Sequence, residues 1–369
     1  MEKPILPVFL SIEKEIREKI ASGEWQRGDK LVNEYNLAEK FNTSRPTLRK
    51  ALVQLKKDGY IVQIPGRGTI ISSPDNHDFK FSEKKHSKAA VRRIAVLIPS
   101  IDNLHYPKMI RGIEDYFHRQ NFQVILGNCD TDPAKEKKYI ETCMEDGLCG
   151  IILAPGFRSL ENIHIYNALK EKKISIVIID TPVRNFNASL VATDNIAGAY
   201  AGTMKLLQSG CRKLIFLSGW LKAESSCERL TGFKKALSEM RIAFDENNIY
   251  SGSFTEQFGY ETALQMLQKK QNIDGIFSAN HPITYGLLRA FRETNQEKIK
   301  NITIATFDGE DIFPYTGIKM ICIIQQKYRI GYTASEKLYE MIRHGKYCND
   351  ESTSKILFTP EIKQNFKTS

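Results

Sequence analysis

The sequence predicts a small α+β head of three helices and a β-hairpin, followed by a larger α/β body with two doubly wound parallel sheets. Three observations support this. The chain has 369 residues, enough for two or three domains at ~150 residues each. More than half of its net positive charge lies in the first quarter of the chain. From residue 93 on, apolar runs of strand length alternate with amphipathic segments of helix length, which is typical of covered parallel sheets.

The composition is that of an ordinary globular protein, with 41% hydrophobic and 26% charged residues. It excludes wholesale disorder, collagen and membrane classes, because no apolar run approaches the ~18 residues needed to cross a bilayer. Acidic residues stand where a signal peptide would have its apolar core, so export is not expected. The seven cysteines are scattered without a CxxC pair. We therefore expect reduced thiols in a cytoplasmic protein, with no disulfide frame and no metal site.

The positive charge is unevenly distributed along the chain. Residues 1–92 hold 18 Lys and Arg against 12 Asp and Glu, a net charge of +6, whereas the remaining 277 residues carry +4. A basic head on a nearly neutral body suggests that the head binds a polyanion. Charge alone is equally compatible with a basic surface that only faces solvent. The sequence motifs of the head distinguish these two interpretations.

The head begins with two short helices. Ile12, Ile16 and Ile20 recur at helical spacing, and Gly23 ends the first helix. A second helix is expected over about 34–40 around Leu37, and Phe41-Asn42-Thr43 forms the turn that follows.

The third helix starts at Ser44, a good N-cap, with Pro46 tolerated in its first turn. Gly59 ends it, and two β-rich runs at 60–64 and 69–71 around the Gly-rich tip Pro65–Gly68 predict a hairpin. A polar, aperiodic segment at 73–92 predicts a linker.

This arrangement predicts a winged helix-turn-helix that binds double-stranded DNA. The start of the second helix of such a motif enters the major groove, where arginines contact guanine or phosphate. The candidate contacts are the first residues of the third helix and the hairpin tip: Ser44, Arg45, Thr47, Arg49, Lys50, Gly66, Arg67 and Gly68.

The head resembles the winged-helix domain of the GntR family of bacterial transcription regulators over about 60 residues. The matching residues are Ile16, Ile20, Gly23, Trp25, Gly28, Leu31, Leu37-Ala38, Phe41, Ser44-Arg45, Thr47-Leu48-Arg49, Ala51-Leu52, Leu55, Gly59 and Gly66–Thr69. One departure is Leu31-Val32-Asn33-Glu34-Tyr35, where the family has Leu-Pro-Ser-Glu and often an arginine. Asn33 can still cap the second helix, but that arginine contact is missing.

The body alternates strands and helices. Strands are expected at 94–99, 123–128, 150–155, 174–180, 213–219, 247–253, 275–280 and 301–308. Helices are expected at 107–119, 135–145, 196–208, 226–240, 257–269 and 284–293. The alternating strands and helices together are longer than one typical domain. We therefore predict two lobes, each with its own sheet, rather than one sheet.

Ligands of open α/β sheets bind at the carboxyl ends of the strands, so the residues after each strand are the candidates. Asp180, Asn280 and Asp308 end or follow strands, and Arg229 offers a planar fork of donors. His105 and Tyr106 follow the first strand, and Phe254 follows the 247–253 run. Charged groups, an amide and a flat aromatic together favour a sugar.

The body, from about 93 to 365, resembles the LacI-type effector domain, which is related to periplasmic sugar-binding proteins. Matching stretches include Ile94–Pro99, Arg111–Glu114, Gly150–Ile152, Asp194-Asn195, Gly232-Phe233, Phe307–Gly309, Gly331 and Pro360–Ile362. With the GntR head, this combination resembles the arabinose-repressor type of regulator. The resemblance implies that Arg229, Phe254, Asn280, Asp308 and Gln325 line the pocket. It also places His105 and Tyr106 where family members often have two aromatic residues.

The resemblance also implies the domain boundaries. We expect a head at 5–72, a linker at 73–92 and an effector-binding and dimerisation domain at 93–366. Its first lobe would comprise about 93–192 and 326–350, and its second lobe about 193–323 and 351–366.

Structural alternatives remain for several of these residues. Asp308 could cap the next helix, and Arg229 could form an ion pair on its own helix. Phe254 and Tyr106 could belong to the core, and Asp180 could only organise a turn. His281, where the family has Asp, is expected to satisfy local backbone.

The sequence favours a regulator over an enzyme, because no phosphate loop, GxGxxG, GxSxG or HExxH motif is present. A GntR head on an aminotransferase-like body would need a longer chain and a lysine within a cofactor-binding motif.

We expect a homodimeric, cytoplasmic repressor of carbohydrate-utilisation genes, without a cofactor. Its effector would be a pentose, a 6-deoxyhexose such as fucose, or a phosphorylated derivative. The alternatives are a sugar-binding module without direct DNA regulation, or a GntR-type regulator that senses a non-sugar metabolite.

Overall fold

The computed structural model describes residues 8–22, 24–26, 28–58, 60–64, 68–72, 92–269, 272–294, 301–311, 316–347 and 353–367. The chain forms two compact units, Met1–Ala90 and Val91–Ser369. The predicted linker at 73–92 lies outside the described residues except for Arg92. None of the helices in these ranges is both long and apolar enough to cross a membrane.

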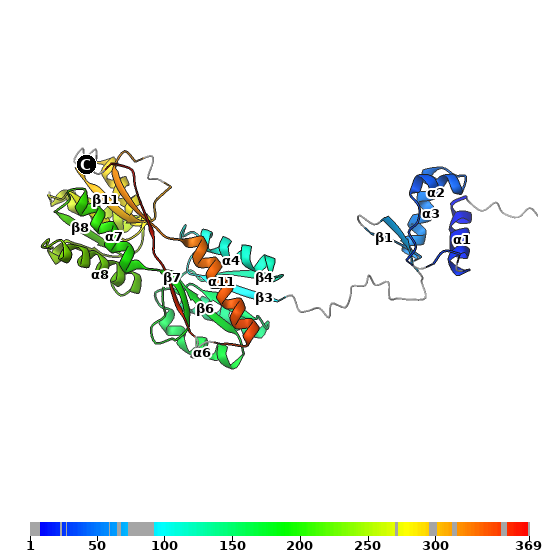
Figure 1. The fold of residues 1–369 in the computed structure, drawn as a ribbon, viewed down its shortest axis with the longest axis horizontal. Helices are drawn as coiled ribbons and strands as arrows, with labels where there is room; N and C mark the ends of the chain where they lie inside the picture. The colour runs from blue at the N-terminus through cyan, green and yellow to red at the C-terminus, as the bar shows by residue number, and fades with distance from the viewer. Residues whose placement is uncertain are drawn as a thin grey trace, which may run out of the picture. The chain divides into compact units, whose positions relative to one another are not determined.

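The head contains three helices and an antiparallel hairpin (Figure 1). They are α1 (Val8–Ala21), α2 (Glu34–Lys40), α3 (Arg45–Lys57), β1 (Ile61–Ile64) and β2 (Gly68–Ile71). The side chains of Asn33 and Ser44 accept hydrogen bonds from Asn36 N and Thr47 N, so both predicted N-caps are confirmed. The helices enclose a small apolar core made of Ile12, Ile16, Leu31, Leu37, Ala38, Leu48, Ala51, Leu55, Ile61 and Ile71.

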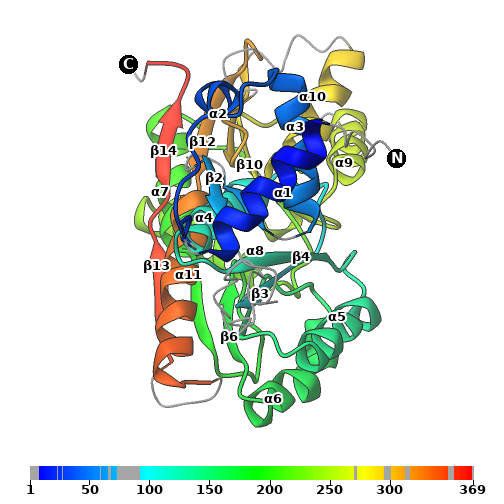
Figure 2. The same cartoon turned by 90° about the vertical axis from the view of Figure 1, so that its right-hand side faces the viewer.

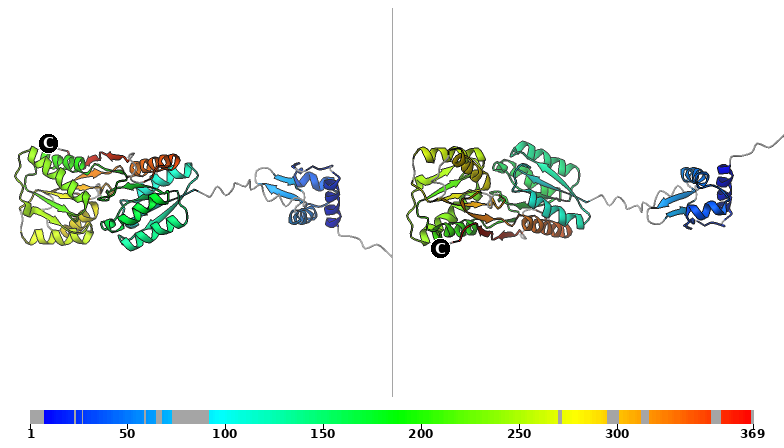
Figure 3. Two further views of the ribbon diagram at one scale, coloured as in Figure 1. Left: turned by 90° about the horizontal axis from the view of Figure 1, so that it is seen from below. Right: turned by 90° about the horizontal axis from the view of Figure 1, so that it is seen from above.

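The first lobe of the body is built on a six-stranded sheet in the order β4-β3-β5-β6-β7-β13, in which all neighbours are parallel. Its strands are β3 (Arg93–Ile98), β4 (Gln123–Asn128), β5 (Gly150–Leu153), β6 (Ser175–Ile179), β7 (Ser189–Thr193) and β13 (Lys355–Phe358). Helices cover both faces of the sheet, which explains why the inner strands read as continuous apolar runs (Figure 3).

One face of this sheet packs against α4 (Pro107–Arg119) and α11 (Lys327–His344), which lies along β13 in Figure 2. The other face packs against α5 (Pro133–Glu145) and α6 (Ile163–Glu171), which a short 3-10 turn, η2 (Ser159–Asn162), precedes. The helices α4 and α11 pack closely because glycines stand at their crossing. A Cβ atom added to Gly331 would lie 2.0 Å from the carbonyl oxygen of Met109.

The second lobe repeats this plan with the order β9-β8-β10-β11-β12-β14, in which only β14 is antiparallel to its neighbour. Its strands are β8 (Leu214–Ser218), β9 (Ile249–Ser251), β10 (Gly275–Ser278), β11 (Thr303–Phe307), β12 (Lys319–Ile324) and β14 (Glu361–Gln364). The helices α7 (Asn195–Gln208) and α8 (Glu224–Glu239) cover one face, and α9 (Glu256–Gln268) and α10 (His281–Glu293) cover the other. A 3-10 turn, η3 (Glu246–Asn248), precedes β9.

The two-lobed α/β architecture predicted from the sequence is confirmed, with one correction to the boundary between the lobes. Residues 351–366 were expected in the second lobe, but β13 pairs with β7 in the first sheet, and only β14 belongs to the second. The physical reason is that Ile356 and Phe358 pack against the apolar cluster beneath α4 and α11. The chain therefore crosses between the lobes at three places: after β7, after β12 and after β13.

Candidate functional site

A cavity of about 780 Å³ in the body is lined by residues from both lobes. All eight residues predicted as effector contacts line it: His105, Tyr106, Asp180, Arg229, Phe254, Asn280, Asp308 and Gln325. Most of them stand at or just after the carboxyl end of a strand, as expected for a parallel α/β sheet. The remaining wall is mixed polar and apolar, so the cavity could take a ligand that carries both kinds of surface.

Asp180, directly after β6, is bound by two residues that follow β3. The Nε2 atom of His105 lies 3.0 Å from Oδ1 of Asp180, and the hydroxyl of Tyr106 donates to Oδ2 over 3.3 Å. Asp180 does more than organise a turn, because its carboxylate holds two side chains of the cavity wall. Tyr106 serves both the core and the cavity, since its ring is buried in the apolar cluster of the first lobe.

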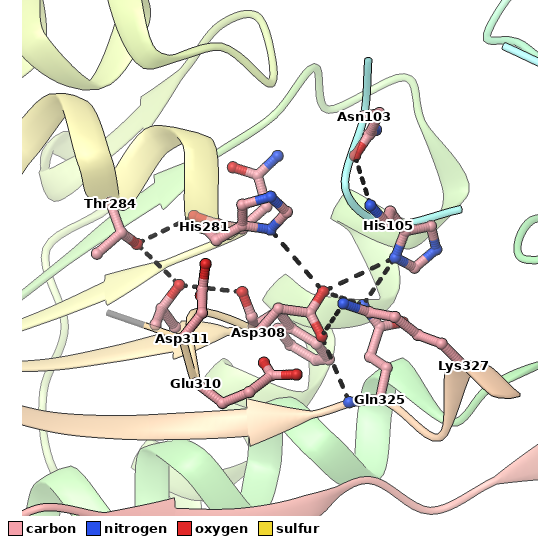
Figure 4. A network of polar contacts seen from close by, with 12 residues as sticks. Asn103, His105, His281, Thr284, Asp308, Glu310, Asp311, Gln325 and Lys327 are labelled. Atoms are coloured by element: carbon pink, nitrogen blue, oxygen red, sulfur yellow. Dashed lines mark hydrogen bonds and ion pairs between the residues drawn. The ribbon is translucent and has the colours of Figure 1, made fainter. Parts of the chain in front are cut away.

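Asp308, directly after β11, lies at the centre of a polar network that spans the two lobes (Figure 4). Lys327 Nζ is 3.0 Å from its Oδ1 atom, and Gln325 Nε2 donates to its Oδ2 atom over 2.9 Å. His105 Nδ1 approaches Oδ2 at 3.7 Å from the first lobe. With these partners Asp308 belongs to a buried polar network, and its role is not limited to capping a helix.

Asp180 and Asp308 share an unusual backbone conformation. Their φ angles are +71° and +61°, in the left-handed region that few residues other than glycine and Asn or Asp adopt. Such conformations cost of order 1–3 kcal/mol each and are found mainly at ligand and switch sites. The two carboxylates are therefore held by strained backbone at equivalent strand ends.

The charges of this network shift one another's pKa values. Burial by itself would lower the pKa of His105, but the carboxylates of Asp180 and Asp308 outweigh it and raise that pKa to about 9. Burial works against ionisation of Asp180 and Asp308, yet the surrounding cations and hydrogen bonds hold both of their pKa values below the ordinary value. At neutral pH the network thus contains two carboxylates and a protonated His105.

Arg229, on α8, supplies a buried cation to the cavity. Its Nε donates to Asn195 Oδ1 over 2.9 Å, and its Nη1 donates to the carbonyl oxygen of Ala279. The guanidinium also lies over the ring of Phe307, 3.9 Å from the ring centre. These contacts orient the guanidinium group at the edge of the sheet. Arg229 therefore bonds to residues outside α8 rather than forming an ion pair within its own helix.

Phe254 and Asn280 line the cavity from the second lobe and also have structural roles. The ring of Phe254 covers Gly219, where an added Cβ atom would lie 2.1 Å from the ring. Asn280 caps α10 by accepting a hydrogen bond from Ile283 N over 3.0 Å, and its Nδ2 donates to the carbonyl oxygen of Phe254 over 3.4 Å. The cap uses one amide oxygen, and the rest of the Asn280 side chain remains half-buried at the cavity wall.

Two residues of the site were not identified from the sequence. Lys327 is buried against Asp308 at the first position of α11. A lysine at the N-terminus of a helix is unfavourable because the helix dipole is positive there. This position could have indicated from the sequence that Lys327 pairs with a carboxylate. His281 was expected to satisfy local backbone, but this expectation is wrong. Its Nδ1 atom is buried without a hydrogen-bond partner and lies 4.0 Å from Asp308 Oδ2.

The head presents its predicted DNA contacts at the start of α3. Arg45, Arg49 and Lys50 are exposed, and the Ser44 hydroxyl lies 2.8 Å from that of Thr47 while it caps the helix. The Nε atom of Arg49 donates to Glu34 Oε2 on α2 over 2.8 Å. This pair ties the two helices of the motif together and fixes the direction of the Arg49 side chain.

The hairpin tip is described only in part. Gly68 has a φ of +91° and lies against the Lys30 side chain, so a side chain at this position would be strained. Gly66 and Arg67 lie outside the described residues. Among the residues that the structure describes, no group of His, Cys, Asp and Glu is arranged to hold a metal ion.

Comparison with known proteins matches both units of the chain to families. Residues 94–346 match the periplasmic binding protein domain, and residues 10–71 match the bacterial regulatory proteins of the gntR family. The arabinose metabolism transcriptional repressor of Geobacillus stearothermophilus is 25% identical over 370 residues, with 98% of each chain covered. The ribose operon repressor of Halalkalibacterium halodurans is 27% identical over 249 residues, 68% of this chain and 72% of its own.

Solved structures show the same fold for the body. The transcription regulator CcpA of Lactococcus lactis superimposes with a TM-score of 0.65 and 25% identity, over 74% of this chain and 97% of its own. A LacI family regulator from Enterococcus faecium with bound ribose gives a TM-score of 0.64 at 24% identity, over 75% and 99% of the two chains.

Proposed function

The chain belongs to the periplasmic binding protein domain family and carries a gntR-family DNA-binding head, and from this we propose that it is a sequence-specific transcription regulator. It represses genes of carbohydrate use, and a small sugar bound between the two lobes of the body controls its affinity for DNA. The effector is a pentose, a 6-deoxyhexose or a phosphorylated derivative. The protein is a cytoplasmic homodimer and performs no chemical reaction.

One observation carries this proposal: a basic helix-turn-helix and a cleft rich in buried polar groups occur on one chain. Arg229, Asp308 and Gln325 place a fork of donors, a carboxylate and an amide on one cavity wall. Hydroxyl groups both donate and accept, so such a wall suits a polyol better than an apolar ligand. The relative named an arabinose metabolism repressor aligns with the whole chain, which supports the same class of function.

The cleft can control the head only if the ligand prefers one arrangement of the lobes. In the structure the lobes are joined by ion pairs of Lys108 with Glu310 at 3.1 Å and of Arg184 with Glu224 at 3.0 Å. A ligand that favours this arrangement of the lobes shifts the population of the regulator. A change from 1:99 to 99:1 requires about 10⁴-fold difference in affinity for the two states.

The test has two stages. Genomic fragments are selected on the purified full-length protein, and binding to the selected duplex is followed by fluorescence anisotropy. A thermal-shift screen then covers L-arabinose, D-ribose, D-xylose and L-fucose and their phosphates, with hypoxanthine and guanine as non-sugar ligands. A ligand at 100 times its Kd adds about 2.7 kcal/mol of stability. We expect a sugar to raise the melting temperature and to release the duplex.

Two outcomes would contradict the proposal. If no DNA fragment is enriched over a variant with Arg45→Ala and Arg49→Ala, the head is not a sequence-specific DNA reader. If DNA binds but only a purine base raises the melting temperature, the alternative of a regulator sensing a non-sugar metabolite is correct.

A further inference from the structure

The cavity in the body is lined by two chemically different sets of side chains, one buried and polar, the other exposed and apolar. Its buried wall is polar and charged, with His105, Arg229 and Asp308 all less than a tenth exposed. The same cavity is also lined by three large apolar side chains that remain open to solvent: Phe157 is 54% exposed, Leu160 46% and Trp220 40%. Exposed apolar side chains that cluster beside polar groups are typical of ligand-binding grooves.

The two aromatic side chains come from opposite lobes. Phe157 follows β5 in the first lobe, and Trp220 follows β8 in the second. Their ring centres are 4.5 Å apart and the rings are tilted by 56°. Neither ring is needed to fill a core, because neither belongs to an apolar cluster of the described residues. Together they form an exposed aromatic surface that the two lobes build jointly.

The volume of the cavity exceeds what one sugar ring needs. At about 780 Å³ it falls within the ~300–1,000 Å³ range of pockets that bury drug-sized ligands, which are much larger than a pentose. A monosaccharide that binds the buried Asp308 and Arg229 would fill only part of this volume. The structure therefore has room for a second group beside the one that the polar wall holds.

We propose that the aromatic surface of Phe157 and Trp220 is a subsite for a second sugar ring, so that the cavity also takes a disaccharide whose first ring is the proposed pentose or 6-deoxyhexose. This inference rests on the proposed function, because it assumes that the polar wall holds the first sugar. A sugar ring has an apolar C–H face that stacks on aromatic rings and hydroxyls that need polar partners. Lys222 and Ser225, which follow Trp220 in the chain, also line the cavity and can supply those partners.

Isothermal titration of the full-length protein with matched pairs of sugars tests the subsite. The pairs are D-xylose with xylobiose and L-arabinose with α-1,5-arabinobiose. We expect at least one disaccharide to bind about tenfold or more tightly than its own monosaccharide. Trp220→Ala and Phe157→Ala should each weaken disaccharide binding by about tenfold, while monosaccharide binding changes by less than about twofold.

Control variants separate stacking from folding. Leu221→Ala removes a neighbouring side chain that is also 40% exposed but does not line the cavity, and it should leave both affinities unchanged. Trp220→Phe keeps a flat ring and should retain most of the disaccharide affinity. An unchanged thermal unfolding transition of the body shows that each variant is folded.

The competing outcomes are distinct. If disaccharides bind no better than their monosaccharides, or if Trp220→Ala weakens both sugars equally, the rings only hold the lobes together and the subsite is overturned, although the sugar-binding function stands. If neither kind of sugar binds to protein that still binds DNA, the proposed sugar effector and the subsite are overturned together.

Discussion

The Nδ1 atom of His105, just before α4 in the first lobe, lies 3.7 Å from Oδ2 of Asp308, just after β11 in the second lobe. The other ring nitrogen of His105 contacts Asp180 in its own lobe at 3.0 Å. A single imidazole thus lies between two carboxylates that belong to different lobes. At 3.7 Å the contact with Asp308 is an ion pair rather than a hydrogen bond, so its strength depends on the charge of His105. The Nε2 atom of Gln325 also lies 3.4 Å from Nδ1 of His105.

We expect His105 to make the stability of the body depend on pH. Its pKa is about 9 in the folded chain against 6.5 for a free imidazole, because Asp180 and Asp308 stabilise the cation more than burial destabilises it. Its contribution is therefore complete below pH 6.5 and is lost as the pH rises to about 9. The groups that face it are Asp180, Asp308, Tyr106 and His281.

Chemical denaturation of the native protein and of His105→Gln between pH 6 and 9.5 checks this. The difference in unfolding free energy should shrink as the pH rises, by up to about 3 kcal/mol. Ile101→Ala, an exposed residue that carries no titratable group in the same loop before α4, is the control and should show no such trend. A pH-independent difference would contradict the ionic contact.

Lys327→Met should destabilise the protein by about 3–5 kcal/mol, because it leaves the carboxylate of Asp308 buried beside an apolar side chain. Adding Asp308→Asn should restore part of the loss, since the uncompensated charge is then removed. A double-mutant cycle of urea denaturation measures this coupling. Additive effects of the two substitutions would mean that the pair is not coupled in solution.

Asp308→Asn by itself should abolish the response to the sugar and leave operator affinity unchanged. The amide keeps the shape of the carboxylate but loses the charge that Lys327 and His105 recognise. Fluorescence anisotropy with and without the effector makes the comparison, with Asp311→Asn as control because Asp311 contacts Tyr285 and does not line the cavity. If the effector still releases DNA from Asp308→Asn, the pocket lies elsewhere.

Arg49→Ala should weaken operator binding by roughly 1–3 kcal/mol if this side chain reads a base. The ion pair with Glu34 orients the Arg49 side chain. We therefore expect Glu34→Gln to reduce the ratio between the affinities of the protein for the operator and for a mutated operator. Lys14→Ala on the exposed side of α1 is the control. An unchanged gel-shift titration for Arg49→Ala would remove this residue from the interface.

Operator affinity should fall steeply with salt, because phosphate contacts release counterions when they form. Each neutralised phosphate adds about −0.9 to the slope of log K against log salt on B-DNA. Lys50→Ala should reduce the slope by about one if this exposed side chain contacts a phosphate. A flat salt titration would contradict the head as a groove-binding domain.

Much of the fold could be predicted from the sequence, because it depends on local patterns. The helix-turn-helix was marked by Ser44 as an N-cap, and α4 begins and ends at the predicted residues. The strands β7, β12, β13 and β14 and the helices α6 and α11 were not predicted. Edge strands such as β13 alternate half-buried with exposed residues and carry a weaker signal than buried strands.

The sequence by itself determined the two-part architecture, the cap and start of α3, and which side chains stand at strand ends. Periodicity and capping act over a few residues, so they can be read along one chain. Only the tertiary structure decided that Lys327 pairs with Asp308, that His105 lies between two carboxylates, and that Phe157 meets Trp220. These contacts join residues 19 to 203 positions apart, and they form only when the two lobes have come together around one cavity.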